Sequence, residues 1–224
     1  MHQEPQEKAT ASAGSPPPFY ELGALASRAE CSEWIGRIDA AMGSRGVPGI
    51  SELHGDLSKR MRAAIDADAG ATEWLRAAAD PGMREVGGNE RFEVVVSDRW
   101  FLMRYDDGDE GMSAHMDGTV RLAGDGAGGC RSAATLLLYL DDGFAGGRTL
   151  FLADAEPRWS YDPDPEPMGT QDAVAVAPRP GRAVLIRQDA WHAAERVWGG
   201  RKHLLRTDVG YSPSAFDHCV VHIS

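Results

Sequence analysis

The sequence has few cysteines, no long apolar run and fewer basic than acidic residues. Its three cysteines, Cys31, Cys130 and Cys219, are an odd number without paired spacing, which favours reduced thiols over a disulfide framework. No run of about 18 apolar residues is present, so we expect no membrane span. The first residues lack the apolar core of a secretory signal, and we therefore expect a cytoplasmic protein.

The shortage of positive charge limits the class of partner. The chain has 23 Lys and Arg against 34 Asp and Glu, a net charge of −11. Proteins that follow a phosphate backbone need clustered Lys and Arg, so we expect no nucleic-acid partner. The net charge does not decide what a pocket binds, because a few local charges dominate there.

The overall composition is that of one globular domain. Hydrophobic residues make up 42% of the 224 residues and charged residues 25%, which is ordinary for a folded protein. This length suits a single domain with a sizeable core. Residues 1–18 are polar and end in three prolines, which predicts a flexible tail. We therefore expect a single domain over residues 19–224.

The first part of that domain, residues 20–82, has a helical pattern. Apolar residues recur at three- and four-residue spacing over 22–42 and again over 57–65. Thr72 is placed to cap a short helix that ends before Pro81. These apolar stripes are interpreted as faces that pack against a core.

The pattern changes after Gly88 to short strands separated by Gly, Pro and Asp, which favours a sandwich or barrel. The expected strands are 92–97, 99–105, 132–140, 148–152, 173–177, 182–187 and 202–211. The acidic, proline-rich segment 153–172 is long for a connection, and such segments are usually functional or disordered. Two interpretations fit this segment: a mobile lid over a substrate, or a disordered insertion.

The strongest chemical signal is His115-Met116-Asp117. Residues i and i+2 of a strand point to one face, so this spacing aims an imidazole and a carboxylate at one point. His192 follows the buried strand pattern of 182–187 and supplies a third candidate ligand. Two histidines and one carboxylate form the facial triad of non-haem iron(II) sites. Taken alone, H-x-D also fits a histidine that only hydrogen-bonds its neighbours.

A candidate cation for an anionic ligand follows ten residues after His192. Alternation along 202–211 places Lys202, Arg206 and Asp208 on one face. Lys202 is suited to the far carboxylate of a dicarboxylate that chelates the metal, although a solvated lysine fits the same pattern. Arg206 is expected either to share that carboxylate, to reach a substrate, or to pair with Asp208 or another acid.

Three blocks, 104–120, 134–152 and 180–211, resemble the prolyl-4-hydroxylase-like branch of the 2-oxoglutarate dioxygenases. The H-x-D, the Tyr-Leu-Asp followed by Gly-Gly-x-Thr, the distal histidine and the later lysine occur in family order. The resemblance implies a mainly β (α+β) fold, a double-stranded β-helix (jelly-roll) core with N-terminal flanking helices, with the core at 92–212. It also implies iron ligation and co-substrate binding by residues that match the family's motifs. The implied iron ligands are His115, Asp117 and His192, and the implied 2-oxoglutarate contacts are Lys202, Tyr105, Tyr139 and Thr149.

The same resemblance implies an activity and its cofactors. The expected enzyme uses Fe(II), 2-oxoglutarate and O2, with ascorbate as a possible support, and hydroxylates an unactivated C–H bond with release of succinate and CO2. No peptide-binding domain is recognisable, which favours a small molecule, an amino acid or a short peptide as substrate. A protein (prolyl) hydroxylase and a non-catalytic 2-oxoglutarate or metal sensor remain alternatives. The oligomeric state is not indicated by the sequence.

Overall fold

The computed structural model describes residues 17–43, 61–66, 69–87, 92–109, 111–122, 130–152 and 173–213. The helices are α1 (Arg28–Gly43) and α2 (Ala69–Gly87). The strands are β1 (Phe19–Ala24), β2 (Met61–Asp66), β3 (Phe92–Tyr105), β4 (Met112–His115), β5 (Ser132–Tyr139), β6 (Ala145–Gly146), β7 (Thr149–Phe151), β8 (Val174–Val176), β9 (Arg182–Arg187), β10 (His192–Ala194), β11 (Val197–Trp198) and β12 (Lys202–Pro213). Neither described helix is both long and apolar enough to cross a membrane.

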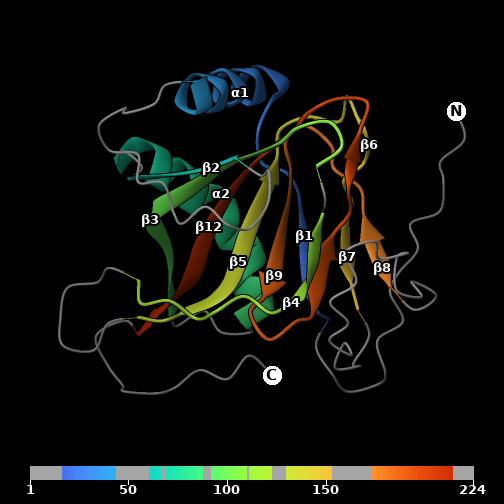
Figure 1. Cartoon of the computed structure of the whole chain (residues 1–224). Coiled ribbons are helices and arrows are strands. Elements are labelled where there is room, and N and C mark those ends of the chain that lie inside the picture. Colours follow the sequence, from blue (N-terminus) through green and yellow to red (C-terminus); the bar gives the residue numbers. More distant parts are fainter. Residues whose placement is uncertain are drawn as a thin grey trace, which may run out of the picture.

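The strands form a large and a small antiparallel sheet. The large sheet has the order β1-β9-β5-β12-β3-β2, and the small sheet has the order β4-β10-β7-β8. A further two-stranded sheet joins β11 to β6. Most neighbouring strands are distant in sequence, as in a jelly roll, and Figure 1 shows the large sheet with the small sheet beside it. The expected double-stranded β-helix core is confirmed.

The large sheet is buried on both faces because its central strands are apolar at successive positions. Along β5, Leu136 and Leu138 pack into one core, while Leu137 and Tyr139 pack into another. Side chains alternate between the faces of a strand, so a continuous apolar run such as this one lines two cores. The large sheet therefore lies between two layers.

The layer on the outer face consists of the helices. Trp34 and Ile38 of α1 and Leu75 and Met83 of α2 belong to the same core cluster as Trp100 of β3. At the start of α1, the Ser27 backbone N–H donates to the Glu30 carboxylate and the Glu30 N–H donates to the Ser27 hydroxyl, which is a capping box. Figure 1 shows both helices on this side of the large sheet.

The inner face of the large sheet meets the small sheet. Met103, Tyr139 and Leu204 of the large sheet share a core cluster with Phe151 and Val176 of the small sheet. This inner core is the one that carries the candidate ligands. The outer core is therefore structural, and the chemistry lies between the two sheets.

The helical pattern expected over 20–82 is wrong in two places. Residues 19–24 form β1, which pairs with β9, and residues 61–66 form β2, which pairs with β3. Both segments lie at the edges of the large sheet, where pairing satisfies their backbone groups and outweighs local periodicity.

The helix expected to end before Pro81 is longer than predicted. The observed α2 continues through Pro81 to Gly87, with Ala79 and Met83 fully buried on its packed face. Burial of this face outweighs the cost of one lost backbone hydrogen bond at the proline. Thr72 lies inside α2 rather than at its cap, and its buried hydroxyl has no hydrogen-bond partner among the described residues.

Most strand predictions after Gly88 are confirmed. The strand at 182–187 is β9, those at 132–140 and 202–211 are β5 and β12, and the expected pair 92–97 and 99–105 is the continuous β3. Residues 1–16 of the expected tail and the whole segment 153–172 lie outside the described residues, so their predictions stand untested.

Candidate metal centre

Two histidines face each other across a pair of strands in the small sheet. His115 is the last residue of β4, His192 is the first of β10, and the two are direct partners in the antiparallel ladder. Their ring centroids lie 4.3 Å apart. His192 was expected at the end of the strand pattern of 182–187, but it begins a separate strand in the opposite sheet.

Each histidine is oriented by a backbone carbonyl. The Nδ1 atom of His115 lies 2.8 Å from the Ser113 carbonyl oxygen, and Nδ1 of His192 lies 3.0 Å from the Ala190 carbonyl oxygen. A carbonyl only accepts hydrogen bonds, so each Nδ1 carries the proton and each Nε2 keeps its lone pair. Both rings therefore present a metal-ligating nitrogen. Burial, followed by the electrostatic effect of the neighbouring His192, lowers the pKa of His115 and favours its neutral form.

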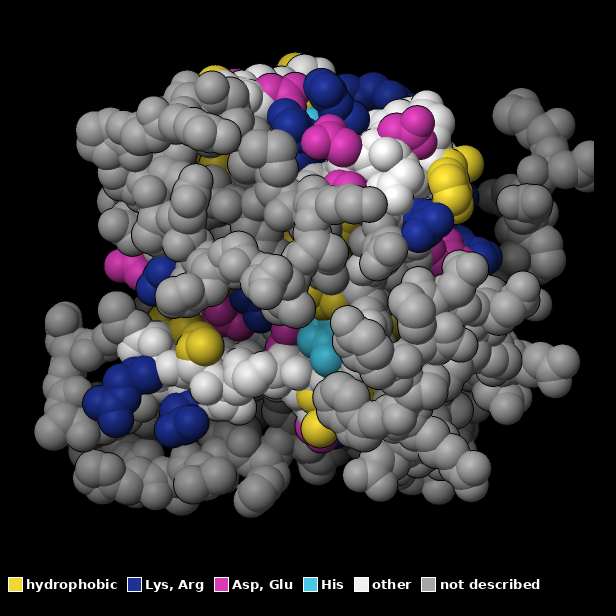
Figure 2. All heavy atoms as spheres, in the orientation of Figure 1, with side chains coloured by type: hydrophobic (Ala, Val, Ile, Leu, Met, Phe, Trp, Pro, Cys, Tyr) yellow, Lys and Arg dark blue, Asp and Glu magenta, His cyan; other side chains and the backbone are white. Residues whose placement is uncertain are grey.

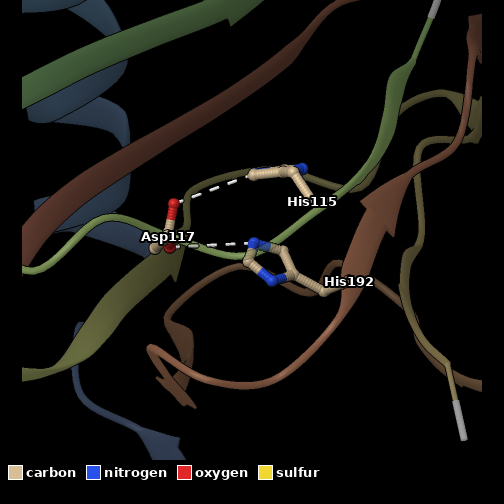
Figure 3. A group of neighbouring side chains, drawn as sticks. All are labelled: His115, Asp117 and His192. Carbon is tan, nitrogen blue, oxygen red and sulfur yellow. Dashed lines mark ion pairs between the residues drawn. The ribbon is translucent and has the colours of Figure 1, made fainter. Parts of the chain in front are cut away.

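Asp117 completes the group from a loop. Its Oδ1 lies 3.8 Å from His115 Nε2, and its Oδ2 lies 3.7 Å from His192 Nε2, as Figure 3 shows. The prediction that strand alternation places Asp117 is wrong, because β4 ends at His115. The three side chains nevertheless converge, because contacts with other strands hold the Asp117 carboxylate in place.

The contacts that hold Asp117 come from the large sheet. A guanidinium nitrogen of Arg206 on β12 lies 3.3 Å from Asp117 Oδ1, and the hydroxyl of Thr135 on β5 also hydrogen-bonds this carboxylate. Burial by itself would raise the pKa of Asp117, but the Arg206 charge and the Thr135 hydrogen bond outweigh it and lower that pKa. Asp117 is therefore ionised, as a metal ligand must be.

The donor set fits a divalent transition metal. The candidate ligand atoms of His115, Asp117 and His192 all lie within 4.8 Å of one another. Two neutral imidazoles and one carboxylate on one side leave further coordination positions open, which is the donor set of non-haem iron(II) oxygenases. Figure 2 shows a hollow on this side of the molecule in which histidine is visible beside acidic and basic side chains.

A second feature of the inner core is the buried ammonium of Lys202, the first residue of β12. Lys202 is 1% exposed, and its Nζ donates to the Gly147 carbonyl oxygen at 2.6 Å. The rings of Tyr105 and Tyr139 lie 5.3 and 5.6 Å from this nitrogen, within the range of cation–π attraction. The Tyr139 hydroxyl is hydrogen-bonded to Thr149 Oγ1 at 2.7 Å. The structure thus brings four sequence-predicted residues into one pocket.

Gly147 was not singled out from the sequence as a contact of this pocket. Its φ is +64°, and a Cβ at this position would lie 2.7 Å from the Phe144 ring and 3.2 Å from Lys202 Cδ. Only glycine allows this backbone to turn and approach the lysine so closely. The Gly-Gly pair before Thr149 was the sequence signal for such an approach.

The ionisation of this pocket follows from its burial. Burial lowers the pKa of Lys202 to about 8, against partial compensation from Asp141 and Glu195. Burial likewise raises the pKa of Tyr139 to about 12, so its phenol keeps its proton. At neutral pH the pocket therefore offers an ammonium and a hydroxyl pair to an anion.

Arg206 does not share the Lys202 pocket. The two side chains lie on the same face of β12 but four residues apart, roughly 13 Å along an extended strand. Arg206 lies at the metal ligands, beside Asp117 and Asp208, and its guanidinium packs 5.2 Å from the Phe101 ring centroid. The expected pairing of Arg206 with Asp208 is observed. Its contact with Asp117 fits the expected pairing with another acid, but the sequence did not identify which acid, because alternation does not place the loop that carries Asp117.

No protein-family model and no curated protein matches this sequence. Several solved structures match its fold. A viral collagen prolyl hydroxylase from Paramecium Bursaria Chlorella virus-1, solved with 2-oxoglutarate, has a TM-score of 0.54 and 14% identity over 87% of this chain and 96% of that one. A Pseudomonas putida prolyl-4-hydroxylase has a TM-score of 0.51 and 16% identity, covering 86% of this chain and 92% of that one.

A third similar structure is HygX from Streptomyces hygroscopicus, solved with nickel, 2-oxoglutarate and hygromycin B. Its TM-score is 0.55 and its identity 12%, over 89% of this chain and 84% of that one. At such low identity the likeness establishes the architecture. The chain therefore has the fold of the 2-oxoglutarate oxygenases, prolyl hydroxylases among them.

Proposed function

We propose that this protein is an Fe(II)- and 2-oxoglutarate-dependent dioxygenase that hydroxylates an unactivated C–H bond, with release of succinate and CO2. The observation that carries the proposal is the convergence of His115, Asp117 and His192 beside an inner core that also holds the buried Lys202: His192 lies next to Phe151 of this core, and Lys202 lies over its Tyr105 and Tyr139 rings. The shared fold supports it. The substrate class we propose is a small molecule, an amino acid or a short peptide.

The residues present fit iron and its co-substrate. His115 and His192 would bind the metal through Nε2 and Asp117 through a carboxylate oxygen, leaving open positions for the co-substrate and O2. When bound, iron and 2-oxoglutarate would activate O2, which is the oxidant: one oxygen atom goes to succinate as 2-oxoglutarate loses CO2, and the other goes to the C–H bond. The protein binds, orients and shields the reacting groups.

Lys202 supplies the charge that orients 2-oxoglutarate. A buried ammonium is costly without an anionic partner, and in the described part of the chain the Lys202 ammonium donates to the neutral carbonyl of Gly147. The distal carboxylate of 2-oxoglutarate would pair with this ammonium and accept a hydrogen bond from whichever of the Tyr139 and Thr149 hydroxyls does not donate to the other. We assign this role to Lys202 and not to Arg206, which lies at the metal ligands.

The pocket also excludes water from the co-substrate. Phe151 is 1% exposed, and its ring lies 6.3 Å from the His192 ring. Leu204 and Tyr105 belong to the same buried cluster. Apolar walls of this kind strengthen the charge pairing at Lys202 because they lower the local dielectric.

The test is conversion of 2-oxoglutarate into succinate by purified, iron-loaded protein, with a panel of metabolites, amino acids and proline peptides as substrates. We expect a basal conversion that increases with the substrate and that His192→Ala abolishes. Glu73→Gln, which removes an exposed ion pair with Arg76 on α2, is the matched control and should leave the conversion unchanged.

The panel also separates the alternatives. Stimulation by a proline-containing protein segment alone would assign the chain as a protein hydroxylase. Binding of 2-oxoglutarate without succinate formation under any condition would contradict the enzymatic proposal and would leave a sensor.

A further inference from the structure

Arg206 connects the metal ligand Asp117 to a buried acid, Asp208. The Arg206 nitrogen Nη2 lies 3.3 Å from Asp117 Oδ1 and 3.5 Å from Asp208 Oδ1. The other terminal nitrogen, Nη1, lies 3.5 Å from Asp208 Oδ2. Asp208 is 3% exposed and lies two residues further along β12. We propose that Asp208, acting through Arg206, is a positioning residue for Asp117 and thereby for the metal. This inference rests on the proposed function.

Asp117 needs such a support because its own segment is not part of a sheet. It lies two residues beyond the end of β4, so no ladder hydrogen bond fixes its backbone. A metal-ligating carboxylate must present one oxygen in a fixed direction, and partners of the other oxygen normally supply that constraint. Arg206 holds Oδ1, which leaves Oδ2 on the His192 side.

The chain of contacts continues from Asp208 back to the loop that carries Asp117. Gln188 hydrogen-bonds the Asp208 carboxylate, and its Nε2 donates to Ser132 Oγ at 2.5 Å. Ser132 Oγ accepts the Val120 N–H at 2.9 Å, and the Ser132 N–H donates to the Val120 carbonyl. Val120 is three residues after Asp117, so the network is anchored both at the carboxylate and at its loop.

The charge distribution explains why an acid is needed at position 208. Arg206 is shared between two carboxylates, and its guanidinium carbon lies over the Phe101 ring, 5.2 Å from the ring centroid. Without the Asp208 charge, the Arg206 guanidinium would pair with Asp117 alone. It would then compete with the incoming metal for the Asp117 carboxylate. Asp208 therefore moderates the attraction of Arg206 for Asp117 and fixes the direction of the guanidinium.

The experiment measures Ni2+ affinity by calorimetry and the Co2+ visible spectrum, both without co-substrate. Asp208→Asn keeps the size of the side chain and removes its charge, and Arg206→Met removes the guanidinium. Loss of an outer-shell partner typically weakens metal binding about 10- to 100-fold, and we expect a loss in that range for each variant, with a changed Co2+ spectrum. Asp109→Asn is the control, because Asp109 is similarly buried but hydrogen-bonds Asp106 after β3.

The double variant tests whether Asp208 acts through Arg206. If it does, Asp208→Asn has no further effect on Ni2+ affinity once Arg206→Met is present. Additive losses, or a parent-like affinity and spectrum in Asp208→Asn, would overturn the proposal. If Asp208→Asn does not fold, Gln188→Leu breaks the network one step further away and must lower the affinity in the same direction.

The outcome also separates this inference from the proposed function. If His115→Ala binds Ni2+ as tightly as the parent does, the metal centre itself is wrong and the proposed function fails with it. If His115→Ala loses Ni2+ while Asp208→Asn keeps it, the metal centre stands and only the network is wrong.

Discussion

Lys202 is the residue whose burial most constrains the chemistry of the pocket. Its ammonium is almost fully buried and is held by a carbonyl and two aromatic rings. Burying a charge in such an environment costs free energy unless an anion pairs with it. The position of Lys202 is therefore better explained by binding of an anionic ligand than by a contribution to folding stability.

Replacement of Lys202 by alanine should therefore separate co-substrate binding from metal binding. A hydrogen bond to a charged group is worth about 1.5–3 kcal/mol, so Lys202→Ala should weaken 2-oxoglutarate binding roughly ten- to a hundredfold. Titration calorimetry with Ni2+-loaded protein measures this affinity, and the affinity for Ni2+ itself should not change. Equal 2-oxoglutarate affinity in parent and variant would remove Lys202 from the site.

The lowered pKa of Lys202 predicts a pH dependence. The ammonium form dominates below a pKa of about 8 and is lost above it. The affinity for 2-oxoglutarate should therefore be constant near neutral pH and fall as pH rises through about 8, while Tyr139 stays protonated. Lys202→Arg keeps its charge over the whole range and should abolish this fall, even if its affinity is lower. A fall of equal size in Lys202→Arg would assign the titration to another group.

The candidate ligands were predictable from the sequence because motif spacing carries them. His115, His192 and Lys202 lie on strands, where alternation and order along the chain decide which face they occupy. The support of Asp117 by Arg206 and Thr135 was not predictable, because it depends on where a loop meets strands distant in sequence.

The docking of α1 on the large sheet depends on a second polar cluster, on the outer face of β12. His203 Nδ1 lies 2.5 Å from an Asp141 oxygen, and its Nε2 lies 3.3 Å from Asp39 on α1. Arg104 of β3 also pairs with Asp39, at 2.9 Å. Burial alone would lower the pKa of His203, but Asp141 and then Asp39 outweigh burial and raise it.

This cluster predicts how stability varies with pH. A histidine with a raised pKa contributes stability that is complete below its unfolded pKa, about 6.5, and is lost as pH rises through the folded value. The free energy of unfolding of the parent should exceed that of His203→Gln by about 1.5–3 kcal/mol near pH 6. The difference should shrink as pH rises. Urea unfolding at several pH values measures it, and a constant difference would show that His203 does not carry the charge.

The two edge strands show what local pattern cannot decide. The apolar residues of 19–24 and 61–66 have spacing that fits a helix, yet both segments pair with exposed sheet edges. The central strands β5 and β9 were predictable because their apolar runs are buried on both faces. Edge strands lack that signature, so the sheet to which they attach decides their conformation.

At the scale of the whole molecule, the helices stabilise the outer face of the large sheet, whereas the candidate metal centre lies on its inner face. The helices cover the outer face of the large sheet, and the small sheet covers the inner face and supplies both histidines (Figure 1). The jelly roll was predictable from the strand spacing together with the family resemblance. The interpretation of 153–172 as a lid remains a prediction, since this segment lies outside the described residues.

The proposed metal centre of His115, Asp117 and His192 should bind iron together with 2-oxoglutarate. The most direct measurement is the visible absorption of anaerobic protein after addition of Fe(II) and 2-oxoglutarate. We predict a weak charge-transfer band that requires both additions, is absent in His115→Ala and His192→Ala, and is retained in Glu73→Gln. The absence of a band in the parent protein, or its survival in both histidine variants, would show that these residues do not form an iron and 2-oxoglutarate site.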